Sequence, residues 1–163
     1  MAEKLFNEPV TKIVDAYDLF DNIHQRELKN FKFRPSAYGI LREGNKVLFK
    51  RHPAIKKYDL PGGGIELDET ITDGLIREFM EETGLMIKVG KLISVEDTYF
   101  TYNGEDAHGI LIFYEVEKIS GELTPNGEDS VDVKFRDIDS LAQENVHRSC
   151  WNIITLIKMK KGA

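Results

Sequence analysis

The stretch PGGGIELDETITDGLIREFMEETGL, residues 61–85, joins three consecutive glycines to a segment that has the boundaries of a helix. Thr70 followed by Asp73 resembles a capping box, although aspartate replaces the usual glutamate or glutamine. Gly84 is the residue type that most often takes the left-handed conformation at a helix end. The sequence therefore predicts a helix over about residues 71–83.

The predicted helix has an apolar face bordered by acids. At about 100° per residue, its apolar positions share one sector: Leu75, Ile76, Phe79 and Met80. Glu78, Glu81 and Glu82 fall in an adjacent arc. An i,i+4 pair of like charges costs an isolated helix roughly 0.2–0.5 kcal/mol, and partial burial raises that cost. We therefore expect a positive charge between Glu78 and Glu82, and we expect Glu82→Gln to stabilise the cation-free chain slightly.

Two arrangements would satisfy these acids. A hard divalent cation such as Mg²⁺ binds carboxylate and carbonyl oxygens, and a glycine-rich bend lets the backbone approach a ligand closely. Alternatively, Arg77 pairs with Glu81 at i,i+4, the acidic face is solvated, and the glycines form an ordinary loop. The glycines favour the first arrangement, but the residues alone leave both open.

The sequence before this stretch predicts strands. Residues 10–28 have apolar positions that fit either a helix or a pair of short strands, and we favour the strands. Residues 36–51 read as two strands joined by Gly44-Asn45, a two-residue connection suited to a tight hairpin. The N-terminal half is therefore expected to contribute mainly to a β-sheet.

The sequence after it predicts a further strand pair and a final helix. Residues 86–102 and 108–119 are rich in β-branched and aromatic residues and are separated by a turn-forming Asn-Gly pair. Residues 130–138 alternate as a short strand, and residues 147–160 have apolar positions at helical spacing. Strands combined with two helices predict an α/β or α+β layer fold.

Composition limits the classes of partner. The 163 residues include 28 acidic and 22 basic side chains, for a net charge of −6, so the chain lacks the basic footprint that binding to a nucleic acid polymer needs. No apolar run approaches the roughly 20 residues that cross a bilayer, which argues against a membrane partner. The sequence does not decide between a monomer and a homodimer.

Location and domain organisation follow from similar arguments. The chain has one cysteine, Cys150, and its start lacks the basic flank and apolar run of a signal peptide, so we expect a cytoplasmic protein. No repeat, low-complexity tract or linker indicates a second domain. We expect a single domain over residues 1–163, with residues 1–33 as an N-terminal extension packed on it.

Taken together, the glycines and acids resemble the Nudix box, G-x5-E-x7-R-E-U-x-E-E-x-G-U, where U is a bulky apolar residue. The matching positions are Gly63, Glu69, Arg77, Glu78, Phe79, Glu81, Glu82, Gly84 and Leu85. Two positions depart from the usual pattern: Phe79 stands where an aliphatic residue is commoner, and Asp68 stands where glycine is common. Both departures are minor, because neither removes an expected ligand. The resemblance implies an α/β/α sandwich with a mixed β-sheet. It also implies Mg²⁺- or Mn²⁺-dependent hydrolysis of the diphosphate linkage in a nucleoside diphosphate derivative.

The same resemblance implies roles for residues of the box. Glu78, Glu81 and Glu82 would hold the metal ions, with the carbonyl of Gly62 as a further ligand. Metal ions suit this reaction because they lower the pKa of water and neutralise the charge that develops on phosphate oxygens. The resemblance also implies that Glu69 and Arg77 form an ion pair, which ties the glycine-rich loop to the helix.

Family members often recruit another acid from a loop before a strand that carries an aromatic residue. Here that strand carries Phe135, and Glu128 is the candidate, with Asp129 next. Glu128 is equally readable as a solvated acid in an Asn-Gly turn. Either Glu128 or Glu78 would accept the proton from the attacking water, and the sequence does not choose between them.

Contacts to the substrate are expected outside the box. Lys50 or Arg51 would meet the phosphates, although either is also readable as a surface charge at a strand end. Tyr102 is similar in position to a tyrosine of dinucleoside polyphosphate hydrolases, and Tyr99 or His108 would stack on or bond a base, although a tyrosine that packs the hairpin is the plainer interpretation. The added signatures of NADH pyrophosphatases and of CoA hydrolases are missing, so the partner is expected to be another small nucleotide.

Two other functions compete with hydrolysis. An isopentenyl diphosphate type of isomerase has a related fold but should carry a catalytic cysteine before the box, whereas this chain has only Cys150 in its last predicted helix. A non-catalytic nucleotide-binding regulator is the second rival, since the same fold can bind ligands after losing its chemistry. The retention of all four box glutamates favours the enzyme.

Overall fold

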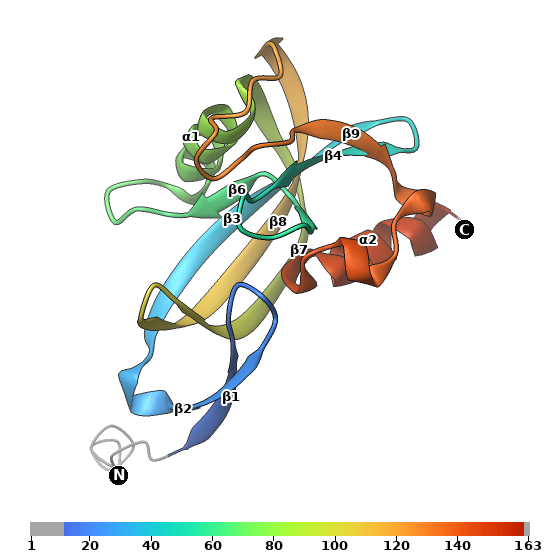
Figure 1. Ribbon diagram of the computed structural model, residues 1–163. Helices are drawn as coiled ribbons and strands as arrows, with labels where there is room; N and C mark the ends of the chain where they lie inside the picture. Colours follow the sequence, from blue (N-terminus) through green and yellow to red (C-terminus); the bar gives the residue numbers. More distant parts are fainter. Residues whose placement is uncertain (1–11, 162–163) are drawn as a thin grey trace.

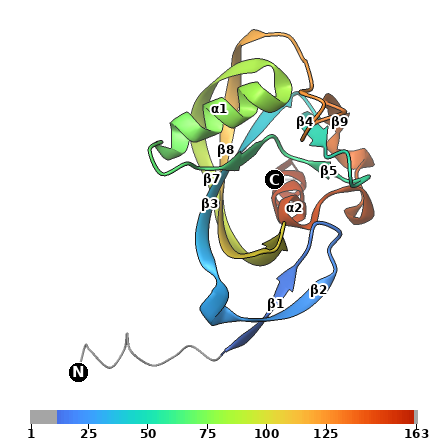
Figure 2. The ribbon, with the colours of Figure 1, turned by 60° about the vertical axis from the view of Figure 1, so that its left-hand side comes forward.

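The computed structural model describes residues 12–161, which form a curled β-sheet with one α-helix packed on each side (Figure 1 and Figure 2). Within these residues the strands are β1 (Ile13–Tyr17), β2 (Ile23–Glu27), β3 (Lys32–Glu43), β4 (Lys46–Arg51), β5 (Tyr58–Asp59), β6 (Gly62–Gly64), β7 (Leu85–Tyr102), β8 (Glu105–Gly121) and β9 (Lys134–Asp137). The helices are α1 (Ile71–Thr83) and α2 (Arg148–Lys161), with short 3-10 turns at Leu28–Asn30, Ile138–Ser140 and Gln143–Asn145.

The sheet is mixed, as the sequence predicts. Its strand order is β2-β1-β7-β8-β3-β4-β5, with β6 paired to β3 and β9 paired to β4. The long strand β3 runs parallel to β8 and antiparallel to both β4 and β6. The α/β/α layer arrangement expected from the sequence is therefore confirmed.

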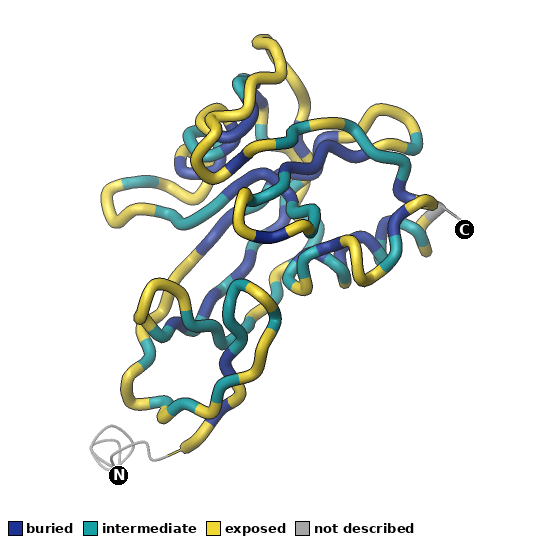
Figure 3. Tube along the Cα trace, viewed as in Figure 1, coloured by how far each residue is buried: buried dark blue, intermediate teal, exposed yellow. Residues whose placement is uncertain are grey.

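Strand β4 shows how the two helices divide the core between them. Leu48 belongs to the apolar cluster with α1, whereas Val47 and Phe49 belong to the cluster with α2. All three are fully buried, because successive side chains of a strand point to opposite faces and both faces are covered. Figure 3 shows this pattern as buried residues along the centre of the sheet and exposed ones at the loops.

The strand interpretation of residues 10–28 is confirmed and the helix alternative is wrong for the described part. Strands β1 and β2 pair antiparallel, with Ile13 opposite Glu27, across a turn in which Asp21 has a φ of 65°. The β1–β2 hairpin extends the sheet beside β7 (Figure 1). The prediction that residues 1–33 form an extension packed on the domain falls partly on residues 1–11, which lie outside the described residues.

The other predicted strands are also present. The Gly44-Asn45 connection joins β3 to β4, with Glu43 opposite Lys46. Strands β7 and β8 form the expected pair. Strand β9 begins only at Lys134, because the residues before it form a loop in which the Asn126 side chain accepts backbone N–H bonds.

Helix α1 has the predicted bounds. The Thr70 hydroxyl accepts a hydrogen bond from the Asp73 N–H at 3.2 Å, and Gly84 ends the helix with a φ of 74°. Helix α2 begins one residue later than predicted, because the His147 N–H donates to the Tyr58 carbonyl and holds residue 147 in the preceding connection. Neither of these helices is long and apolar enough to cross a membrane.

Candidate functional site

The glycine-rich strand β6 lies between β3 and helix α1. Gly62 has a φ of 137°, and a Cβ atom there would lie 2.1 Å from the Ala37 carbonyl oxygen. A Cβ atom on Gly63 would lie 2.6 Å from Glu78 Oε2. Both positions therefore need glycine, the first for backbone packing and the second to make room for a carboxylate. The glycines allow α1 to lay its acids directly on the backbone of β6.

Glu82 is the most buried of the box acids, with 5% of its side chain exposed. It accepts hydrogen bonds from the Gly62 N–H at 2.9 Å and from Lys50 Nζ. Burial raises the pKa of Glu82 to about 7, and the Lys50 charge and the Gly62 N–H oppose that rise. The structure thus gives Gly62 a contact with α1 through its N–H group, whereas the resemblance assigns a ligand role to its carbonyl.

Arg77 connects the helix to the loop that precedes it. Its Nε and Nη2 atoms donate to the two carboxylate oxygens of Glu69 at 2.5 and 3.0 Å, and Nη2 also donates to the Gly64 carbonyl at 3.1 Å. Nη1 donates to Glu78 at 2.9 Å and to Glu81 at 3.3 Å. The guanidinium beside Glu69 lowers the pKa of that carboxyl to about 2. These contacts place Arg77 where the resemblance expects it, while its part in any reaction stays a prediction.

Positive charge does sit among the acids, as the like-charge argument requires, but it comes from Lys50 and Arg77. Glu82→Gln would leave the Lys50 ammonium buried beside a neutral amide, which is unfavourable. The Lys50 contact therefore reverses the expectation that this change stabilises the cation-free chain. The interpretation of Lys50 as a surface charge is also wrong, since only 10% of its side chain is exposed.

The donor set nevertheless fits a hard divalent cation. Glu78, Glu81 and Glu82 present carboxylate oxygens along one edge of α1, beside a strand without side chains. Within residues 12–161, no three acidic, histidine or cysteine side chains stand in a ligating arrangement. The three acids instead contact Lys50 and Arg77. Binding a cation there requires the two basic side chains to give up part of these contacts.

Glu128 lies in the exposed loop between β8 and β9. The Asn126 Oδ1 atom accepts N–H bonds from Glu128 and Asp129 at 3.0 and 3.1 Å, which is the geometry of a solvated turn. Among the described residues, the Glu128 side chain makes no hydrogen bond or ion pair. The loop is tied to β4, because the Val131 N–H donates to the Arg51 carbonyl at 3.0 Å. The loop containing Glu128 is thus anchored near Arg51.

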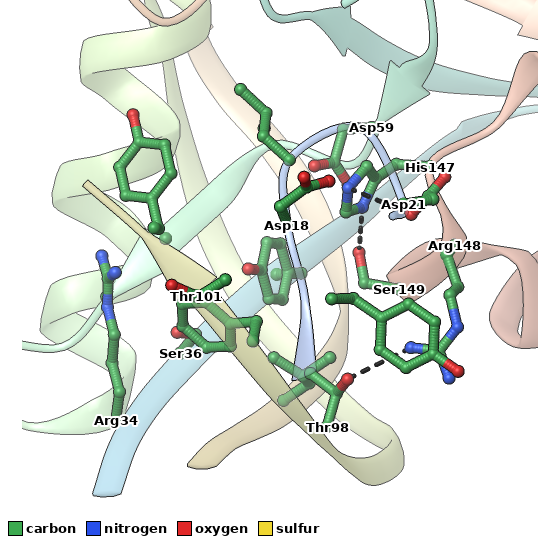
Figure 4. A pocket seen from close by; sticks show the side chains of 18 residues that line it. Asp18, Asp21, Arg34, Ser36, Asp59, Thr98, Thr101, His147, Arg148 and Ser149 are labelled. Carbon is green, nitrogen blue, oxygen red and sulfur yellow. Dashed lines mark hydrogen bonds and ion pairs between the residues drawn. The ribbon is translucent and has the colours of Figure 1, made fainter. Parts of the chain in front are cut away.

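A pocket of about 180 Å³ lies on the side of the sheet that faces α2 and the β1–β2 turn (Figure 4). Gly63 and Gly64 form part of its wall, so the pocket and the acids of α1 share strand β6. Tyr102 lines the pocket. An ion pair between Lys57 and Asp21 holds the β1–β2 turn beside the pocket. The pocket thus provides room for a ligand next to the candidate metal site.

His108 does not reach this pocket. It lies on β8 three residues before Leu111, which lines the pocket, so the two side chains point to opposite faces of the strand. The His108 ring stacks on Tyr99 with centroids 4.4 Å apart, and its Nε2 atom lies 2.7 Å from Asp97. The structure therefore separates His108 from Tyr102, which the sequence analysis grouped as substrate contacts.

Several pocket residues were missed by the sequence analysis. They come from segments far apart in the chain: Asp18, Asp21, Arg34, Asp59, His147 and Arg148. None stands in a motif, and single charged residues in turns and at strand ends are usually solvated. Asp21 alone had a local signal, because it lies in a short turn between two predicted strands at the edge of the sheet.

Comparisons with known proteins agree with this geometry. The sequence model of the NUDIX domain matches residues 32–155. The "ADP-ribose pyrophosphatase" of Methanocaldococcus jannaschii is 34% identical over 130 residues, which cover 73% of each chain. The "Probable DHNTP pyrophosphohydrolase" of Lactococcus lactis subsp. cremoris is 37% identical over 123 residues, which cover 71% of this chain and 74% of that protein.

Solved structures share the fold. The E. coli ORF135 protein superposes with a TM-score of 0.66 and 19% identity, over 83% of this chain and 96% of that one. The MutT NUDIX hydrolase from Burkholderia pseudomallei superposes with a TM-score of 0.63 and 20% identity, over 76% of this chain and 97% of that one. At such identities the likeness concerns the arrangement of helices and strands alone.

Proposed function

The chain belongs to the Nudix family of hydrolases, and we propose that it cleaves the diphosphate linkage of a nucleoside diphosphate derivative at the junction of α1 and β6. The family membership makes it a hydrolase of phosphoric anhydrides. The names of its archaeal and lactococcal relatives, a pyrophosphatase and a pyrophosphohydrolase, support this reaction class. They support a small nucleotide, rather than a nucleic acid polymer, as the substrate.

The observation that carries the proposal is the shared strand β6. On one side, the Glu78 carboxylate lies where a side chain on Gly63 would be, and on the other side the pocket opens beside Gly64. A nucleoside seated in the pocket would extend its diphosphate across the side-chain-free backbone toward the acids of α1. Tyr102, which lines the pocket, would contact the nucleoside, and the scissile bond would lie near Glu78.

Glu78, Glu81 and Glu82 would hold the cation, Mg²⁺ or Mn²⁺. When bound, such an ion lowers the pKa of water and neutralises charge on the phosphate oxygens. Glu82 binds a cation in its ionised form, so the Lys50 ammonium has to move aside or shift toward the substrate. Arg77 holds Glu78 in place through its bond at 2.9 Å, and Glu69 in turn fixes Arg77 through two bonds. These contacts support the Glu78 carboxylate against β6 before a cation binds.

Two residues remain candidates for the general base. The Glu78 carboxylate, carried by α1, lies against β6 at Gly63, which favours Glu78 by position. Glu128 lies in a loop anchored to Arg51, and it would have to approach the cation site when substrate binds. Arg51 is the candidate for a phosphate contact at this end of β4. Parallel pH–rate profiles of Glu78→Gln and Glu128→Gln would identify the base, since its loss removes the limb that reports deprotonation.

The proposal is tested by a substrate screen under Mg²⁺ and under Mn²⁺. Dinucleoside polyphosphates, ADP-ribose, nucleotide sugars and oxidised nucleoside triphosphates would be incubated with the protein, and the phosphorylated products would be identified by mass. We expect at least one class to be hydrolysed, with the activity lost in Glu82→Gln prepared in the same way. That variant controls for contaminating pyrophosphatases.

Absence of turnover for every compound under both metals would favour the non-catalytic regulator. The isomerase has less support, because the single cysteine of the chain is fully buried in α2 and its thiol donates to Asp59 Oδ1 at 2.7 Å. Burial and the nearby carboxylate raise the pKa of Cys150 well above its usual range, which disfavours a thiolate.

A further inference from the structure

We propose that Arg34 binds the phosphate group adjacent to the nucleoside and so fixes the direction in which a nucleotide enters the pocket. This inference rests on one part of the proposed function, namely that the pocket binds the nucleoside. Arg34 lies on β3 at one end of the pocket, and Asp21, Asp59 and His147 lie at the other end (Figure 4).

The guanidinium of Arg34 lies directly against the backbone of β6. A Cβ atom on Gly64 would lie 3.1 Å from Arg34 Nη2 and 3.2 Å from Nε. The neighbouring Gly63 makes the same kind of room for Glu78, and adjacent residues of a strand face opposite sides. Arg34 and Glu78 therefore flank the glycine strand from its two sides, which is the path that a diphosphate would take.

Apart from Arg51 at the end of β4, Arg34 differs from the basic side chains near the site. Within residues 12–161, its side chain has no hydrogen bond or ion pair, and its guanidinium carbon lies 5.8 Å from the centroid of the Phe100 ring. The neighbouring basic side chains already have partners: Lys50 with Glu82, Lys57 with Asp21, Arg77 with Glu69, and Arg148 with Tyr17 and Thr98. Arg34 thus has its full donor capacity available to a ligand.

The charges of the pocket support one orientation. Asp21 and Asp59 lie at the end of the pocket away from Arg34, and Asp18 lies between the two ends (Figure 4). Carboxylates there repel a phosphate but accept hydrogen bonds from the N–H groups of a base. A guanidinium offers a planar pair of donors that matches two phosphate oxygens. The base would therefore lie toward the acids, with the phosphate against Arg34.

Binding without metal tests this inference separately from hydrolysis. Calorimetry in EDTA would compare AMP, GMP, CMP and UMP with adenosine, guanosine, cytidine and uridine. For the best-bound pair, we expect the monophosphate to bind at least about tenfold more tightly than its nucleoside, in line with a hydrogen-bonded charge pair. In Arg34→Gln that preference should fall to within about twofold, with nucleoside affinity unchanged, and Arg34→Lys should retain part of it.

Arg42→Gln is the matched control. Arg42 is an exposed arginine on the same strand, at its opposite end, so the change removes the same charge away from the pocket. We expect Arg42→Gln to keep the full preference for the monophosphate. Equal losses in the two variants, no preference in the unsubstituted chain, no measurable binding of any pair, or loss of nucleoside binding in Arg34→Gln would each overturn the inference.

The outcomes also separate this inference from the proposed function. If the chain prefers monophosphates through Arg34 but hydrolyses nothing in the substrate screen, the Arg34 inference holds and the proposed enzymatic function is wrong. If the chain hydrolyses a nucleotide and Arg34→Gln has the same KM as the unsubstituted protein, the proposed enzymatic function holds and the Arg34 inference is wrong.

Discussion

Lys50 and Glu82 form an ion pair inside the protein, with 10% and 5% of their side chains exposed. Lys50 lies on β4 and Glu82 on the last turns of α1, so the pair bonds the sheet to the helix across the apolar cluster. Glu82 also receives the Gly62 N–H. The same carboxylate that the Nudix box assigns to a cation is thus held by an internal ammonium.

Lys50→Met should therefore destabilise the chain in a pH-dependent way. Removing one partner of a buried pair costs about 3–5 kcal/mol while the other stays charged. Burial raises the pKa of Glu82 to about 7 although Lys50 lowers it, so removing Lys50 raises that pKa further. The carboxyl of the variant is then neutral at pH 6 and ionises only at a cost as pH rises. Urea unfolding should show a loss that is larger at pH 8 than at pH 6.

A double variant checks the mechanism of that loss. Lys50→Met combined with Glu82→Gln removes both charges and keeps an oxygen for the Gly62 N–H. We expect the double variant to be more stable at pH 8 than Lys50→Met alone. Equal stability of the two variants at pH 8, or a Lys50→Met loss that does not vary with pH, would show that the pair contributes little.

Divalent metal should stabilise the protein through the acids of α1. A ligand that binds only the folded state adds about 2.7 kcal/mol at 100 times its Kd. Glu82→Gln should weaken the stabilisation by Mg²⁺ or Mn²⁺, and in the unsubstituted chain the effect should shrink as pH falls below about 7, because a protonated Glu82 does not bind a cation. Thermal melts at constant ionic strength measure both.

The control for the metal effect is Glu117→Gln, which removes an exposed carboxylate from β8. Its response to metal should match that of the unsubstituted chain. If the two variants respond alike, the ion is binding general surface charge instead of the acids beside β6.

Substitution of the two neighbouring glycines should separate fold from function. In Gly63→Ala the new Cβ meets the end of the Glu78 side chain, which can swing away, so the fold should survive while activity falls at least about tenfold through misplacement of the carboxylate. In Gly62→Ala the new Cβ meets backbone at 2.1 Å, at a φ that L-residues avoid, so the thermal midpoint should drop sharply. Melting curves and turnover of the same preparations give the comparison.

Glu69→Gln should alter the acid limb of the stability profile. Arg77 lowers the pKa of Glu69 from its ordinary value of 4.5 to about 2, so the pair stabilises the folded chain above pH 4.5 and loses that contribution as pH falls toward 2. The variant should be less stable than the unsubstituted chain at pH 6, and the gap should close toward pH 2. A gap that stays constant across this range would contradict the assignment.

The same variant should affect hydrolysis less than Glu82→Gln does. Glu69 acts through Arg77, whose other bonds to Gly64 and Glu78 remain, whereas Glu82 would contact the cation itself. Turnover under saturating metal compares the two variants. Equal loss of activity with unchanged melting temperatures would place Glu69 among the groups that contact the cation or the substrate.

Local chemistry explains how much the sequence alone could predict. The bounds of α1 depend on a cap at Thr70 and a left-handed Gly84, and the β3–β4 turn depends on Gly44, so neighbours within a few residues determine these features. The spacing of the box glutamates likewise fixes their common edge on a helix. The sequence by itself therefore determined the two helices, the longer strands, the family resemblance and the edge that carries the acids, but not the short strands β5 and β6.

Only the tertiary structure decided which groups those acids meet. Lys50 precedes Glu82 by 32 residues, and nothing in the local sequence indicates that β4 presents this ammonium to α1. The pocket draws Asp21, Arg34 and His147 from a turn, a strand and the start of a helix. His108 points to the face of β8 opposite the pocket. Alternation along the strand predicts that some side chains point away from the pocket, but only the packing of α2 on one face of the sheet shows which ones. Packing between apolar faces that are distant in the sequence fixes these contacts. The hydrophobic effect that drives this packing is non-directional, so no single position in the sequence indicates which segments will meet.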